Sequence, residues 1–263
     1  MLKVHDITQF MESFAPARLA EDWDNVGLLV GDCSAEVGAV MTCLTVTPVS
    51  AAEAIERGAQ LIVTHHPLPF RPLKRITTGD TPGRMLWEFI QAGVAVYSPH
   101  TAFDSAAEGI NQRLAQGLQL DNITPLQPAD GDIDGLGAGR YGRLNGPLRL
   151  TEFIARVKQF LSVAGLHVVA RPDAQVQNVA VACGSAGQFL ASAIAADCDT
   201  LVTGETNFHT CLEAEAQGFT LVLPGHYASE RFAVESLAEV LASEFPDVEI
   251  WASQQERDPL AWV

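Results

Sequence analysis

Apolar and polar residues follow one another along the chain in blocks that predict strands and helices in turn. Continuous apolar runs at 37–46, 60–64 and 94–98 predict three buried strands. Between them, 50–58 and 81–93 place apolar residues at helical spacing, and each ends in a glycine, as helices often do. Alternating helices and fully apolar strands indicate a parallel sheet with helices on both faces.

The same order returns after a polar, glycine-rich stretch at 127–147, which we predict to be a linker or the boundary between two lobes. Further helices are predicted at 5–15, 150–161, 187–198, 208–218 and 229–245, and further strands at 166–170, 176–183, 200–204, 219–225 and 248–253. The pattern predicts two α/β/α lobes with mainly parallel sheets, spanning residues 1–126 and 127–263. The helix and strand within 229–253 are expected to pack back on the first lobe.

The two halves resemble each other in sequence. AAEAIERGAQLIVTHHP (51–67) aligns with LASAIAADCDTLVTGET (190–206), with Val-Thr at the strand end in both. Downstream, HTAFD (100–104) and HYASE (226–230) share the pattern His-x-Ala-x-carboxylate. We therefore predict that the lobes are related by a pseudo-repeat.

Side chains that bind metals well follow several predicted strand ends, where ligands gather in parallel α/β sheets. They are His65, His66, His100, Asp104, His226 and Glu230. A purely structural role is the commoner one for a single histidine, but six such residues at strand ends favour a metal site. Imidazoles with carboxylates suit zinc, iron, manganese, cobalt or nickel. Two ions are favoured over one, because a carboxylate can bridge them and a closed tetrahedral zinc has only four ligands.

Two other segments carry candidate chemistry. Trp23-Asp24-Asn25 precedes an apolar run, which indicates either an ordinary turn or a substrate contact at the mouth of the site. CGSAGQF (183–189) could offer backbone N–H groups to an anion. The candidates for a general acid or base are His100, Asp24, Glu205 and His209.

Charge and composition narrow the class of partner. The chain has 16 Lys and Arg against 32 Asp and Glu, for a formal net charge of -16, and we see no Lys/Arg cluster that would attract nucleic acid. No apolar run is long enough for a membrane helix. The five scattered cysteines indicate free thiols in a reducing cytoplasm. A small-molecule substrate fits this profile better than nucleic acid or membrane.

Five motifs, in order along nearly the whole chain, resemble the Nif-three-like family, often labelled GTP cyclohydrolase 1 type 2 homologues. They are WDNVGLLVGD, VTHHP, HTAFD, TGETNFH and GHYASE. The resemblance implies a dinuclear metal site between two lobes and a toroidal homohexamer. Carried over by motif, the implied ligands are His65, His66, Asp104, His226 and Glu230, with Glu230 bridging the ions.

This chain departs from the family pattern at two places. Ala102 and Phe103 replace the Asn-Leu pair of the family's second motif, which leaves nearby substrate contacts open. Phe208-His209 stands where the family tends to carry two histidines, which leaves the role of His209 open.

Two functions follow as hypotheses. The first is a dinuclear metal-dependent hydrolase in which activated water attacks its substrate. By the family label, this would be attack on C8 of the guanine ring of GTP, with loss of formate. The alternative is a non-catalytic metal-binding, metal-delivery or regulatory protein that acts as a ring-shaped oligomer.

Overall fold

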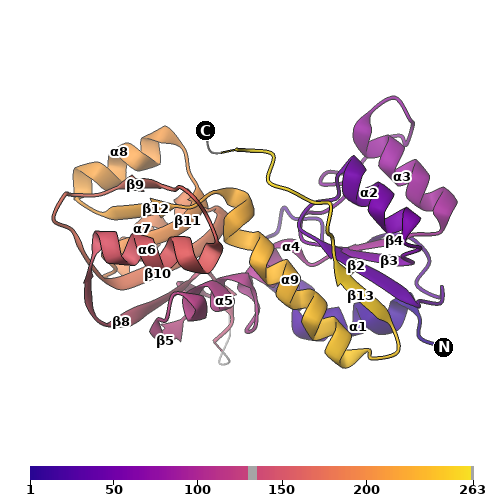
Figure 1. Ribbon diagram of the computed structural model, residues 1–263, viewed down its shortest axis with the longest axis horizontal. Helices are drawn as coiled ribbons and strands as arrows, with labels where there is room; N and C mark the ends of the chain where they lie inside the picture. Colours follow the sequence, from indigo (N-terminus) through magenta and orange to yellow (C-terminus); the bar gives the residue numbers. More distant parts are fainter. Residues whose placement is uncertain (130–134, 262–263) are drawn as a thin grey trace. The chain divides into compact units, whose positions relative to one another are not determined.

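The computed structural model describes residues 1–129 and 135–261, which fold into two compact units (Figure 1). The first unit comprises Met1–Phe103 and Ala233–Arg257, and the second comprises Asp104–Phe232 with the described residues from Asp258 onward. The chain passes between the units within helices α4 (His100–Ser105) and α9 (His226–Glu244). The lobe boundary expected after residue 126 stays a prediction.

A five-stranded sheet forms the centre of the first unit, in the order β1-β4-β3-β2-β13. Its strands are β1 (Gly27–Val30), β2 (Ala39–Cys43), β3 (Leu61–Thr64), β4 (Ala95–Ser98) and β13 (Glu249–Ala252). All neighbouring strands run parallel except the edge strand β1, which pairs antiparallel with β4. The last strand of the chain, β13, lies beside β2, with Ile250 opposite Val40.

Helices cover both faces of this sheet (Figure 1). On one face α2 (Pro48–Glu56) and α3 (Thr81–Ala92) pack on Met41, Ile62 and Val96 through residues such as Ala54 and Phe89. The opposite face meets the C-terminal half of α9, since Thr42 Oγ1 donates a hydrogen bond to the Val234 carbonyl at 3.0 Å. Helix α1 (Val4–Phe14) packs against the same helix end through Phe10 and Phe245, whose ring centroids are 5.6 Å apart.

Two buried carboxylates tie the segment after β13 to the first unit. Glu53 of α2 accepts hydrogen bonds from Ser253 Oγ at 2.6 Å and from the backbone N–H groups of Gln254 and Gln255. In return, Glu256 accepts from the N–H groups of Leu44 and Thr45 after β2, at 2.8 and 2.6 Å. Hydrogen bonds to charged groups contribute about 1.5–3 kcal/mol each, so these contacts fix both the chain end and the residues that follow β2.

We expect Glu53→Gln to lower the free energy of unfolding by about 2 kcal/mol at pH 7, because the amide loses the charge in these bonds. Burial alone raises the pKa of Glu53, but the bonds from Gln254, Ser253 and Gln255 outweigh it and leave the pKa below its ordinary value of 4.5. A lowered folded pKa stabilises the fold above the unfolded pKa, and this contribution is lost as pH falls through the folded value.

Urea unfolding at pH 7 and at pH 3.5 measures this effect. The difference between wild type and Glu53→Gln should be largest at pH 7 and should shrink at pH 3.5. Glu56→Gln, an exposed position on the same helix, is the matched control and should change stability by less than about 0.5 kcal/mol. A difference that is equal at both pH values would contradict the role given to the Glu53 charge.

The second unit is built on a six-stranded mixed sheet, in the order β5-β8-β10-β11-β12-β9. Its strands are β5 (Asp121–Thr124), β8 (Arg140–Arg149), β9 (His167–Val169), β10 (Gln175–Ser185), β11 (Thr200–Glu205) and β12 (Thr220–Leu223). Only the β10–β11 and β11–β12 pairs are parallel, and β5, β8 and β9 join antiparallel. The expectation of a mainly parallel sheet therefore holds for the first unit and not for the second.

Alternation along its strands sends side chains to the two faces of this sheet. Val179 and Val181 of β10 contact α5 (Ile110–Gly117) and α6 (Leu150–Leu161). Ala180 and Ala182 contact α7 (Leu190–Ala195) and α8 (Phe208–Gln217) on the other face. The second unit therefore has helices on both sides of its sheet, like the first.

The stretch at 127–147 was expected to be a linker or a lobe boundary, and a linker is wrong for its second half. Residues from Arg140 onward belong to β8, which lies inside the sheet between β5 and β10. Its buried positions are occupied by Arg140, Gly142 and Leu144, so the alternation of apolar residues is masked by a cation and a glycine. Earlier in the stretch, the short strands β6 (Gln127–Pro128) and β7 (Gly137–Ala138) pair with each other, and residues 130–134 lie outside the described residues.

Short 3-10 turns at Ala17–Leu19 and Gly187–Phe189 complete the described elements. The five cysteines are free thiols. Within residues 1–129 and 135–261, no helix has the length and apolar character of a membrane span.

Candidate metal centre

The two adjacent histidines of VTHHP follow directly after β3. Backbone bonds from His65 and His66 to the carbonyls of Cys43 and Leu44, at 3.0 and 2.8 Å, continue the ladder with β2. Their rings tilt toward each other, with centroids 5.0 Å apart, although side chains of neighbouring strand residues ordinarily point to opposite faces. The end of the strand therefore brings both imidazoles to one place.

A third imidazole, that of His100, completes a group in the first unit. One ring nitrogen from each of His65, His66 and His100 lies within 4.8 Å of the other two. At this spacing, a single ion could contact all three nitrogens. His100 begins α4 with a φ of +27°, an uncommon conformation for a residue other than glycine. Such strain gathers at functional sites, where the surrounding structure holds it in place.

Asp24 holds His100 in position. Its Oδ1 lies 2.7 Å from His100 Nδ1, and its Oδ2 accepts from the backbone N–H and the hydroxyl of Thr101 at 3.1 and 2.5 Å. Burial alone raises the pKa of Asp24, but the bonds from His100 and Thr101 outweigh it and lower the pKa to about 2. Asp24 is thus a fixed carboxylate, and it contacts a histidine of the group and not open solvent.

Each of three histidines has its Nδ1 held by a neighbouring side chain. His66 Nδ1 lies 2.6 Å from Thr45 Oγ1, His100 Nδ1 lies 2.7 Å from Asp24, and His226 Nδ1 lies 2.9 Å from Glu205 Oε1. Histidines that bind metals are nearly always fixed in this way through their second nitrogen. The arrangement fixes the orientation of each of the three rings.

The second unit gathers Asp104, His226 and Glu230 around the end of β10. Cys183 Sγ donates to Asp104 Oδ1 at 3.1 Å, and His226 Nε2 lies 3.1 Å from Glu230 Oε2 within the first turn of α9. Gly184 N–H donates to Ser229 Oγ at 2.9 Å, which ties the strand end to that same turn. The spacing of four residues between His226 and Glu230 does place them on one face of the helix, as predicted.

Gly184 leaves room for this set. Its φ is +65°, and a methyl group there would collide with Oε1 of Glu230 and lie 3.5 Å from Nε2 of His226. The absence of a side chain at Gly184 leaves the Glu230 carboxylate and the His226 imidazole unobstructed at this strand end. Together they offer the oxygen and nitrogen donors that a metal ion needs. The residues present therefore fit a divalent transition-metal ion.

Neighbouring carboxylates shift the pKa values of two residues in this set. The hydrogen bond to Glu230 raises the pKa of His226 to about 9 against the opposing effect of burial, and Glu205 adds to the rise. Burial raises the pKa of the Cys183 thiol well above its ordinary value, and the charges of Asp104 and Glu230 raise it further. Cys183 is therefore a neutral thiol here, and the negative charge resides on the carboxylates.

The remaining candidate, His209, belongs to neither group of possible metal ligands among the described residues. It is exposed on α8, beside Phe208, at a hollow of about 560 Å³ in the second unit. Of the four acid–base candidates, Asp24 and His100 contact each other, and Glu205 contacts His226. The catalytic assignments stay predictions.

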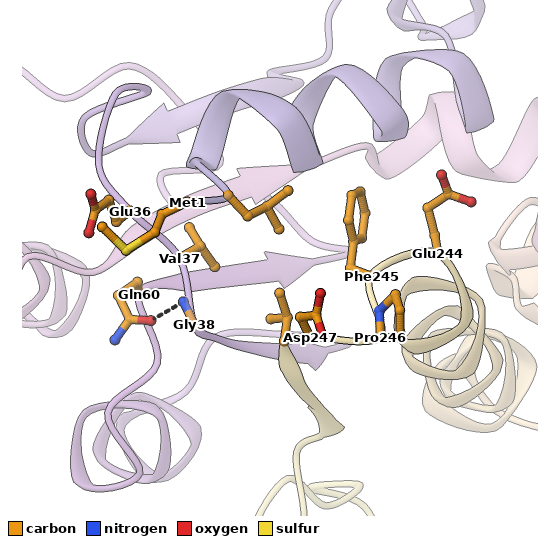
Figure 2. A pocket seen from close by; sticks show the side chains of 11 residues that line it. Met1, Glu36, Val37, Gly38, Gln60, Glu244, Phe245, Pro246 and Asp247 are labelled. Atoms are coloured by element: carbon orange, nitrogen blue, oxygen red, sulfur yellow. Dashed lines mark hydrogen bonds between the residues drawn. The ribbon is translucent and has the colours of Figure 1, made fainter.

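A larger groove in the first unit has different chemistry. Figure 2 shows this groove of about 920 Å³, which lies between the N-terminal residues and the turn after α9. Its charged lining residues, Glu36, Glu244 and Asp247, are exposed carboxylates. The Gln60 amide oxygen is already engaged by Gly38 N–H at 2.8 Å. The groove therefore lacks the imidazoles and the converging donors that the histidine groups provide.

Several residues at the site were not found from sequence. Thr45, Cys183, Gly184 and Ser229 have types that serve ordinary structural roles, and their importance depends on contacts with residues far along the chain. The only sequence signal was CGSAGQF, which suggested an anion site. The structure gives the N–H groups of its first two residues to other partners, since Cys183 N–H donates to Asn111 Oδ1 and Gly184 N–H to Ser229 Oγ.

Comparison with known proteins agrees with these motifs. A family model described as Duf34/NIF3 (NGG1p interacting factor 3) matches residues 2–259. A Clostridium acetobutylicum protein named GTP cyclohydrolase 1 type 2 homolog is 34% identical over 229 residues, covering 87% of this chain and 85% of its own. NIF3-like protein 1 of Drosophila melanogaster is 32% identical, covering 99% and 89%.

The fold also matches solved structures. A Bacillus cereus protein related to NIF3 superposes with a TM-score of 0.91 at 25% identity, covering 100% of this chain and 99% of that one. The likeness extends over the whole mixed α/β chain and not over one unit alone. The chain therefore belongs to the Duf34/NIF3 family.

Proposed function

We propose that this protein is a dinuclear metal-dependent hydrolase whose ligands come from both units. The first unit would contribute His65 and His66, and the second would contribute Asp104, His226 and Glu230, with Glu230 as the bridge. The proposal includes two α/β lobes related by a pseudo-repeat, the metal centre between them, and assembly into a toroidal homohexamer.

One observation carries the proposal: the Nδ1 atoms of His66, His100 and His226 are each held by a separate side chain. His66 and His226 are proposed ligands, and the groups that contain them also hold His65, His100 and Glu230, which favours metal ligation over structural hydrogen bonding. When bound, divalent ions would supply Lewis acidity and make water nucleophilic near neutral pH.

The chain's own residues would orient and move protons around that centre. Asp24 fixes the His100 ring by accepting a hydrogen bond from Nδ1, so Nε2 would be the nitrogen that transfers a proton. Glu205 performs the same fixing role for His226. The names of relatives make GTP the first substrate to test, with ring opening and formate release as the reaction.

We expect the purified protein, reconstituted with zinc, manganese, iron(II), cobalt or nickel, to retain about two ions per chain. His66→Ala and Glu230→Gln should each lose at least one ion, because each removes a donor. His5→Ala, which removes an exposed imidazole on α1, is the matched control and should keep both. Elemental analysis after gel filtration, with circular dichroism to verify folding, measures this.

Activity assays then separate the functions. Loaded protein is incubated with GTP and with a panel of phosphate esters, and formate and phosphate are measured. Turnover that disappears in His66→Ala but not in His5→Ala supports the hydrolase. Two stably bound ions without release of either product would favour the metal-binding, delivery or regulatory role. Failure to bind metal after reconstitution would overturn both.

A further inference from the structure

We propose that Trp23 and Phe70 form a binding platform for a planar heteroaromatic ring that carries a phosphate group. The basic residues that follow Phe70 would hold the phosphate. The platform would select the substrate of the histidine group, so this inference rests on the proposed function and names its substrate class. All of its residues belong to the first unit.

The two aromatic side chains are exposed and adjacent. Trp23 is 63% exposed and Phe70 is 49% exposed, and their ring centroids are 6.2 Å apart with an angle of 42° between the planes. Single exposed apolar residues are common, but two large aromatic rings side by side form a local patch that favours a ligand. Flat rings of this kind bind nucleobase-like groups by stacking.

The platform adjoins the histidine group. The His100 ring lies edge-on to both aromatic rings, with centroids 6.0 Å from Trp23 and 5.9 Å from Phe70. The two loops are also joined, because Asn25 Nδ2 donates to the Pro69 carbonyl at 2.7 Å. Asn25 lies two residues after Trp23, and Pro69 directly precedes Phe70, so this bond fixes the position of the two aromatic residues relative to each other. A ring on the platform would lie next to the imidazoles.

A short basic run continues from Phe70. Arg71, Lys74 and Arg75 are exposed, and none forms an ion pair with another residue in the described part of the chain. These three cations stand within five residues of a chain whose formal net charge is -16. The expectation that no basic cluster exists therefore needs correction, since this loop offers one place where an anion is attracted.

Together these features define the ligand. An uncharged aromatic ring would contact only Trp23 and Phe70. A phosphate without a ring would contact only the basic residues of the loop. A ligand with both would gain stacking and the charge-assisted hydrogen bonds that Arg and Lys donate to phosphate. A nucleoside monophosphate has both groups and is the simplest probe.

The test measures binding by calorimetry, with metal-free protein and with reconstituted protein. Guanosine 5′-monophosphate should bind at least about 10-fold more tightly than ribose 5-phosphate or guanosine. Trp23→Ala and Phe70→Ala should each weaken it by about 10- to 100-fold, the range that loss of one stacking contact gives. Trp23→Phe should stay within about 3-fold of wild type. Trp87→Ala, which removes another exposed aromatic ring of the same unit, is the matched control and should leave binding unchanged.

A double variant tests whether the basic residues contribute to phosphate binding. Arg71→Gln with Lys74→Gln should weaken the monophosphate by about 10-fold and reduce the salt dependence of its binding, while guanosine is unaffected. Arg18→Gln with Lys158→Gln changes the net charge equally, outside the loop, and should leave binding as in wild type.

The outcomes separate this inference from the proposed function. Ring-dependent binding that persists in protein unable to hold metal would support the platform while the hydrolase fails. Metal-loaded protein that binds no probe, or Trp23→Ala that binds like wild type, overturns the platform. If wild type binds no probe and Trp23→Ala lowers the mass measured by light scattering, the pair is an interface between copies and the inference is wrong.

Discussion

Replacing Arg140 by methionine is expected to lower the free energy of unfolding by about 3–5 kcal/mol, among the largest effects of any single change in this chain. The guanidinium is only 1% exposed in the second unit, yet it carries a full charge. For a protein of this size, a loss of that magnitude lowers the melting temperature by roughly 10 °C.

The reason lies in the number of partners that the side chain satisfies. Nη1 donates to the carbonyls of Gly137 and Gly139 at 2.6 and 2.7 Å. Nη2 donates to the Ala106 carbonyl at 2.9 Å, and Nε donates to Gln112 Oε1 at 3.0 Å. Methionine fills similar space but leaves these buried acceptors without their donor, which costs about 1–3 kcal/mol for each acceptor that water does not reach.

Arg143→Met is the matched control. Arg143 lies on the same strand with its side chain exposed, so its loss should cost less than about 1 kcal/mol. Arg140→Lys should fall between the two, because an ammonium keeps the charge but cannot reproduce the planar fork of donors. Thermal and urea unfolding measure all three variants. Equal stability of Arg140→Met and Arg143→Met would contradict the role of the buried charge.

Arg140 also explains why one strand could not be predicted from the sequence. The runs at 37–46, 60–64 and 200–204 predicted buried strands correctly. Strands buried on both faces of an α/β sheet are continuous apolar runs, which can be recognised in the sequence without knowledge of their tertiary contacts. Strand β8 was missed because a cation occupies a buried position. Besides two nearby carbonyls, its guanidinium needs Gln112 Oε1 and the Ala106 carbonyl, which lie 28 and 34 residues away along the chain. Burial of a charge depends on tertiary partners, so no local pattern could have indicated it.

At the site, the sequence indicated the donors but not what holds them. His65, His66, His100, His226 and Glu230 were visible because their types follow strand ends and because the motifs resemble a known family. Thr45, which fixes His66, lies 21 residues away on a neighbouring strand end. Such an orienting contact depends on the register between β2 and β3, and a single sequence does not give that register.

Gly184→Ala is expected to reduce metal affinity by about 10- to 100-fold, the range seen when residues that support metal ligands are changed. Gly184 lies at the end of β10 with φ at +65°, where its missing side chain leaves room for the Glu230 carboxylate. An added methyl group would collide with Oε1 of Glu230, so the carboxylate or the strand end must move. Either movement displaces the donor that we propose as the bridge between two ions.

Backbone strain must be separated from this collision, and Gly58→Ala does so. Gly58 has a nearly identical φ of +68°, but an added methyl group there would meet no atom within 4 Å. Both variants should therefore lose a similar stability of about 1–2 kcal/mol from the left-handed conformation, while only Gly184→Ala loses metal affinity. Competition with a chelator of known affinity measures the second quantity, and unfolding of the metal-free proteins measures the first. If the two variants bind metal equally well, Glu230 does not hold an ion from this position, and the dinuclear centre as proposed is wrong.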